Sequence, residues 1–149
     1  MQSFDRLTLD NLTIAFPSDW EDKSHGDTTY FESPDGTKGF YVALWHMEEE
    51  EQRSPSQLVE VFLAAELRSY VDGSDDREVV STHVEQAADS VICTWDTLSR
   101  DNGYRVAGKI QARGRYVLRG TFHDYDCSDF DRSGEYFAPI IGSFELLEA

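Results

Sequence analysis

Residues 89 to 125 alternate between apolar and polar side chains, and two turn signals interrupt the alternation. Asp101-Asn102-Gly103 is typical of a tight hairpin turn, and Gly114 marks a second reversal. Apolar residues otherwise recur at every second position, which is the spacing of a strand with one buried face. The pattern predicts an antiparallel meander with strands over 90–98, 104–113 and 116–123. A fold for this chain must therefore contain an antiparallel sheet.

The same period of two predicts further strands before the meander. Ser33-Pro34-Asp35-Gly36 is a strong turn signal between two of them. The strand after this turn is apolar on both faces, which predicts cover on both sides of the sheet. Asp10-Asn11 suits the turn of an opening hairpin, and Pro17 ends its second strand because proline cannot donate to a ladder. These strands are predicted over residues 7–9, 12–16, 28–32, 39–46 and 79–84.

Two segments have helical spacing instead. The first runs from about 55 to 71, with Ser54 as N-cap, Gln57 completing a capping box, and Asp72-Gly73 at its end. The second is the aromatic tail over 129–147, in which Pro139 should kink or split the helix. Together these patterns predict an α+β fold in which a central antiparallel sheet of about six or seven strands is flanked by helices. The length, 149 residues, predicts one domain over 1–149.

This order of elements is similar to that of the Mog/PsbP-like superfamily. The resemblance lies in the opening LTIAFPSDW at 12–20, the strand–turn–strand unit at 28–46, the helix opened by Ser54-Pro55, the meander at 89–125 and the aromatic closing helix. It implies an α/β/α sandwich and a non-enzymatic role, since members bind proteins, as a small-GTPase regulator, photosystem subunits and bacterial chaperones of secreted toxins do. A photosystem role is not expected, because the N-terminal residues do not resemble a transit peptide.

The charge is strongly acidic and unevenly distributed. The net charge is −16, with 29 acidic residues against 13 basic ones, yet six basic residues meet only Asp101 between 100 and 119. Such a field disfavours nucleic acid and anionic membranes and favours a basic protein partner. We expect the basic residues to lie on one strand face of the meander and to pair with nearby acids. The acidic residues expected to dock a partner are Glu48, Glu49, Glu50, Glu51, Asp72, Asp75, Asp76, Asp124, Asp126 and Asp129.

No motif indicates a catalytic set, a cofactor or a metal site. The loop from Asp124 to Glu135 partly follows a calcium-loop pattern, but Asp129 replaces the glycine required at its sixth position, so helix capping explains it better. His83 and His123 could meet across strands, with Cys127 nearby, but no ligand or nucleophile spacing supports a site. Cys93 and Cys127 are expected to be free thiols in a cytoplasmic protein, since the chain shows no signal peptide and no apolar stretch long enough to span a membrane.

Three hypotheses of function remain open at this stage. The leading one is an immunity protein that binds and neutralises a cognate secreted bacterial toxin through its acidic surface. The second is a chaperone or adaptor that holds an apolar segment of a secreted effector in a groove lined by Trp45, Tyr41 or the closing helix. The third is an enzyme or ligand-binding domain with a pocket around His83, His123 and Cys93. The identity of the partner and the oligomeric state stay open.

Overall fold

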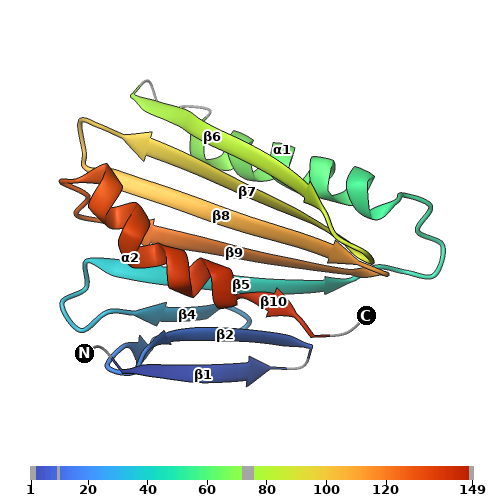
Figure 1. The fold of residues 1–149 in the computed structure, drawn as a ribbon, viewed down its shortest axis with the longest axis horizontal. Helices are drawn as coiled ribbons and strands as arrows, with labels where there is room; N and C mark the ends of the chain where they lie inside the picture. Colours follow the sequence, from blue (N-terminus) through green and yellow to red (C-terminus); the bar gives the residue numbers. More distant parts are fainter. Residues whose placement is uncertain (1–2, 10, 72–75, 148–149) are drawn as a thin grey trace.

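A seven-stranded antiparallel sheet forms the centre of the protein in the computed structural model, which describes residues 3–9, 11–71 and 76–147 (Figure 1). Its strand order is β3-β4-β5-β9-β8-β7-β6. The predicted central sheet of an α+β fold is thereby confirmed. The strands are β3 (Glu21–Asp22), β4 (Thr29–Glu32), β5 (Lys38–His46), β6 (Arg77–Gln86), β7 (Ser90–Ser99), β8 (Tyr104–Arg113) and β9 (Tyr116–Asp124).

Helices cover both faces of this sheet. In Figure 1, α2 (Phe130–Ser143) crosses in front of the sheet and α1 (Pro55–Val71) lies behind it. Neighbouring residues of one strand point to opposite faces, so Val117 of β9 packs in the core under α1 while Leu118 packs in the core under α2. Neither helix of the described residues combines the length and the apolar character needed to cross a membrane.

A second, three-stranded sheet shares the α2 side. It consists of β1 (Phe4–Leu9), β2 (Leu12–Pro17) and β10 (Glu145–Leu146), in the order β1-β2-β10. The predicted opening hairpin is therefore present, but it lies outside the central sheet. Its Ile14 and Phe16 pack with Phe40 and Phe137 in one core, so the small sheet and α2 form one layer.

The meander forms as predicted. Residues of β7, β8 and β9 pair in register over their whole lengths, with Trp95 opposite Gly108 and Gly108 opposite Thr121. Gly103 and Gly114, at the two turns, both have φ of +59°, a conformation that favours glycine. The helix α1 also begins where the sequence indicates, because the amide of Ser54 donates to Gln57 Oε1 (2.8 Å) and the amide of Gln57 donates to Ser54 Oγ (3.2 Å). The Asp72-Gly73 end lies outside the described residues.

The C-terminal segment differs from the prediction of a helix to Leu147. The helix α2 ends at Ser143, and Pro139 does not split it. Phe144 is already extended, with φ −81° and ψ 113°, and β10 follows and pairs with β2. Phe144 and Leu146 are both buried in this extended form, and the amide of Leu146 donates to Gln111 Oε1 at 2.8 Å. Helical spacing of apolar residues could not reveal this change, because the strand buries the same residues.

Candidate functional site

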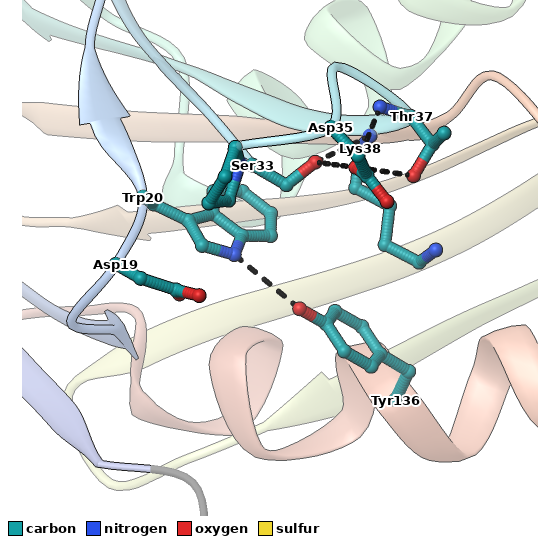
Figure 2. Close-up of a pocket in the computed structure, with 8 residues that line it drawn as sticks. Asp19, Trp20, Ser33, Asp35, Thr37, Lys38 and Tyr136 are labelled. Atoms are coloured by element: carbon teal, nitrogen blue, oxygen red, sulfur yellow. Dashed lines mark hydrogen bonds between the residues drawn. The ribbon is translucent and has the colours of Figure 1, made fainter.

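A groove lies beside the first half of α2, where the β4–β5 turn and the loop after β9 meet. It consists of two adjoining cavities of about 260 and 160 Å³ that share Lys38 and Tyr136. Figure 2 shows the larger one, with Trp20 and Asp19 on one side and the β4–β5 turn on the other. We call these two cavities the α2 groove. Its charged lining residues, five carboxylates against two cations, are Asp19, Asp35, Asp124, Asp126, Asp129, Lys38 and Arg132.

The β4–β5 turn holds one carboxylate of the groove in its charged form. Asp35 Oδ1 accepts hydrogen bonds from the Thr37 amide (3.0 Å), the Thr37 hydroxyl (2.8 Å) and the Ser33 hydroxyl (2.8 Å). These bonds lower the pKa of Asp35 to about 2, the Thr37 amide contributing most. The Ser-Pro-Asp-Gly signal thus does two things: it reverses the chain, and it fixes an anion at the rim of the groove.

An aromatic floor lies between the two cavities. Trp20 Nε1 donates to the Tyr136 hydroxyl at 3.3 Å, and both side chains point into the larger cavity (Figure 2). The Lys38 ammonium lies 5.1 Å from the centre of the Tyr136 ring. A cation over an aromatic face is attracted by the ring quadrupole. The α2 groove therefore already holds one lysine of its own over an aromatic ring.

The end of β9 and the loop after it supply the other carboxylates. Asp129 is the N-cap of α2 and accepts from the Arg132 amide at 3.1 Å, which agrees with the capping interpretation of this loop. Asp126 is exposed at the rim. Asp124 is only 3% exposed, and its Oδ1 accepts the Asp126 amide at 3.1 Å, so it offers a partner almost no surface. Of the three predicted docking residues in this loop, two are accessible.

The other predicted docking residues lie elsewhere. In the β5–β9 register, Lys38 at the start of β5 lies opposite Asp124. The acidic run from Glu48 to Glu51 comes after the other end of β5, so it lies at the opposite end of the sheet (Figure 1). Glu51 is ion-paired with Arg53 at 2.6 Å. Asp76 accepts hydrogen bonds from Ser99 Oγ and Asn102 Nδ2. Asp72 and Asp75 lie outside the described residues.

Several basic residues of the meander are turned inward, on both faces of the sheet, whereas Arg100 and Arg115 are exposed. The guanidinium of Arg105 is ion-paired with Asp96 at 2.6 Å and donates to Ser133 of α2, and Arg113 is paired with Asp89. On the α1 side, Arg119 is paired with Glu66 at 2.6 Å. The predicted pairing with nearby acids is confirmed for these arginines. The expectation of one shared strand face is wrong, because the Arg119 side chain lies on the α1 face of the sheet, whereas the Arg105 side chain lies on the α2 face.

The histidines and cysteines do not gather into a pocket. His83 lies on β6 opposite Thr94, while His123 lies on β9, and the strands β7 and β8 lie between them, so the two do not meet. His123 is 3% exposed. Its Nδ1 forms a hydrogen bond of 2.6 Å with the Tyr104 hydroxyl, and its ring stacks on the Tyr104 ring. Cys93 is buried, and both cysteines are free, as predicted. In the described part of the chain, no three His, Cys, Asp or Glu side chains converge to hold a metal.

A second, apolar groove lies on the α1 side, between β5 and α1. We call it the Trp45 groove, a cavity of about 280 Å³ lined by Trp45, Val61, Phe62, Ala65, Glu66 and Arg119. Trp45 contacts Phe62 edge-on, with ring centres 4.9 Å apart, and remains 36% exposed. Val61 is 46% exposed. The sequence indicated Trp45 for such a groove, but not the residues of α1 that complete it.

Comparison with known proteins identifies the fold. No protein-family model and no curated protein matches the sequence. Among solved structures, the cyanobacterial PsbP (CyanoP) of Synechocystis sp. PCC 6803 superposes with a TM-score of 0.73 at 13% identity, over 98% of this chain and 94% of that one. The Ran-binding protein Mog1p of Saccharomyces cerevisiae superposes with a TM-score of 0.54 at 9% identity, over 99% and 97% of the two chains. The chain therefore has the Mog/PsbP-like fold that its order of elements resembles.

Proposed function

We propose that this protein is a non-catalytic protein-binding module whose α2 groove takes up basic side chains of its partner. More specifically, we propose an immunity protein that binds and neutralises a secreted bacterial toxin with a basic surface. The observation that carries the proposal is the way Lys38 lies in the groove. Its ammonium lies over the Tyr136 ring, where the two cavities adjoin, and Asp19, Asp35, Asp126 and Asp129 line the groove around it, which is the environment that an incoming lysine or arginine needs.

The distribution of charge supports a basic partner over bulk solubility alone. Three arginines of the meander are held in ion pairs with the protein's own carboxylates: Arg105 with Asp96, Arg113 with Asp89 and Arg119 with Glu66. The surplus of acid is therefore left for the outer surface, where it would steer a basic protein towards the groove and speed its association. The fold is compatible with this role, since the structural neighbour Mog1p is a Ran-binding protein.

The test is binding to the protein encoded beside this one, measured by calorimetry or surface plasmon resonance at low and at high salt. Asp126→Asn with Asp129→Asn removes two exposed charges, and asparagine still caps α2. At about 0.2–1 kcal/mol for each exposed ion pair, the double variant should bind about twofold to thirtyfold more weakly.

A matched control removes two charges at the other end of the sheet, by Glu49→Gln with Glu50→Gln. The proposal predicts that this control binds as the wild type does. Equal losses in the two double variants would mean that only the total charge matters. Binding that ignores salt would contradict an electrostatic groove altogether.

The Trp45 groove favours a second candidate, a chaperone or adaptor that holds an apolar segment of a secreted effector. An exposed tryptophan beside an exposed valine is typical of a binding surface. In this case Trp45→Ala should abolish binding of the same neighbouring protein, while added salt and the Asp126/Asp129 double variant should change it little. The two candidates therefore give opposite results in one set of measurements.

A further inference from the structure

The strand β6 forms a long, uncovered edge of the central sheet. In the described part of the chain it pairs only with β7, and nine of its ten residues are exposed. It is the outermost strand of the sheet in Figure 1, where its free side faces away from the molecule. An edge strand of this kind presents a row of unpaired backbone N–H and C=O groups, which is a template for another strand.

Only half of this edge is protected. A bulge between Val79 and Ser81 disrupts the first half, and bulges are one device by which proteins prevent pairing at an edge. From Ser81 to Gln86 the strand pairs regularly with β7, and these six residues include no proline and one charged residue, Glu85. The second half of β6 therefore keeps the regular geometry that an added strand requires.

The two faces of this half differ in chemistry. Residues opposite each other in an antiparallel pair share a face, and Val84 lies opposite Cys93, whose side chain belongs to the core under α1. Val84 itself is 51% exposed, whereas Thr82 and Gln86, which lie opposite Trp95 and Val91 on the same face, are polar, so the α1 face of this half has one exposed apolar side chain. Glu85 and His83 lie on the other face, opposite Ile92 and Thr94, and both are exposed. An added strand would thus meet one exposed valine on the α1 face and an acidic group on the other face.

We propose that residues 81–86 bind an extended segment of a partner protein as an eighth strand, and that this segment alternates apolar and basic residues. An apolar side chain of the segment would cover Val84, and a basic one would face Glu85. A second copy of this chain is disfavoured as the occupant, because it would bring a net charge of −16 against −16. This inference goes beyond the α2 groove, since it uses a different surface and a backbone mode of recognition.

The test uses a synthetic peptide that alternates valine and lysine, with a control peptide in which the same residues are grouped in two blocks. Amide hydrogen exchange, followed by NMR, reports where each peptide binds. The proposal predicts that the alternating peptide slows exchange in residues 81–86 by tenfold or more, and that the block peptide does not. Equal effects of both peptides, or protection elsewhere only, would overturn it, since charge attraction alone would then explain the binding.

Two substitutions separate the faces. Glu85→Lys should weaken binding of the valine–lysine peptide by about threefold to tenfold, as expected for reversal of one exposed charge. The same variant should bind a peptide that alternates valine and glutamate more tightly than the valine–lysine peptide. Val84→Lys should prevent binding, whereas Leu147→Lys, a similar change at an exposed aliphatic residue outside both grooves, should not. A further measurement raises the protein concentration in the absence of peptide. If amide exchange in residues 81–86 then slows and light scattering gives the mass of a dimer, the occupant is a second copy and the proposal is wrong. Asp126→Asn with Asp129→Asn should leave peptide protection unchanged, so failure here and failure of the α2 groove are distinguishable.

Discussion

Alanine in place of Gly108 should destabilise the protein by about 3 kcal/mol, because Trp95 lies directly on this glycine. A Cβ at position 108 would lie 2.0 Å from Trp95 Cε2 and 2.2 Å from Cζ2. Carbon atoms in contact are ordinarily about 3.5–4.0 Å apart, so the indole would have to move by about 1.5 Å. It has little freedom to do so, being 2% exposed and packed against the Tyr70 ring.

The magnitude follows from the filled core on the far side of the ring. Adding a methyl group to a well-packed core costs about 1–3 kcal/mol, and a rigid ring with nowhere to move places this site at the upper end. Urea unfolding followed by far-UV circular dichroism measures the loss. At a denaturant dependence of about 1–3 kcal/mol per molar urea, the midpoint should fall by about 1–3 M.

Two further variants test whether Trp95 restricts position 108. Gly142→Ala, in α2, adds a methyl group with no atom within 4 Å and should stabilise by about 0.5–1 kcal/mol. In a Trp95→Leu background, Gly108→Ala should cost at least about 1.5 kcal/mol less than in the wild type, as coupled neighbours do. A loss below about 1 kcal/mol for Gly108→Ala in the wild type, or additive losses in the double variant, would show that Trp95 does not restrict this position.

Three other predictions follow from single side chains. Asp129→Ala should cost about 1 kcal/mol in urea unfolding and Asp129→Asn almost nothing, since both aspartate and asparagine cap helices. Burial, with two nearby arginines, lowers the pKa of His123 to about 4. The unfolded chain, with a pKa of about 6.5, therefore binds the proton more readily, so the free energy of unfolding should fall by up to about 3 kcal/mol between pH 6.5 and 4, and His123→Gln should remove that part of the slope. A thiol reagent at pH 8 should modify Cys127 in the native protein, slowly because burial raises the pKa of its thiol, and Cys93 only on unfolding.

The strands and the first helix were predictable because each has a local signal. The capping box at Ser54 is satisfied by residues three positions apart, and the meander turns carry glycines at the two positions with positive φ. The strand β10 has no such signal. Its pairing with β2 and the hydrogen bond from Leu146 to Gln111 join segments far apart in the chain, and only the folded sheet brings them together.

The α2 groove was predictable only in part for the same reason. The acidic loop after β9 was visible as composition, and Asp126 and Asp129 do line the groove. Asp19, Asp35 and Tyr136 come from three other elements, and their sequence signals indicated only a turn, a strand end and a helix face. Composition also suggested that the run of four glutamates was equivalent to the acidic loop. The β5 register separates the two, because it places them at opposite ends of one strand.

Three arginines of the meander are paired within the protein, and this bears on both the α2 groove and the β6 edge. Strand alternation directs Arg105 and Arg113 towards α2 and Arg119 towards α1, and each meets a carboxylate of the protein at 2.6 Å. The Arg105 side chain is only 7% exposed, and a buried cation that lost its partner would be costly, so Arg105 cannot turn outward to offset the surface acids. The local positive balance of the meander therefore does not form a binding surface of its own. Because each of these arginines is matched by a carboxylate, the pairs cancel and the net charge of −16 stays on the rest of the protein. A partner that neutralises this charge must supply its cations itself, which is why both the α2 groove and the β6 edge favour a basic protein.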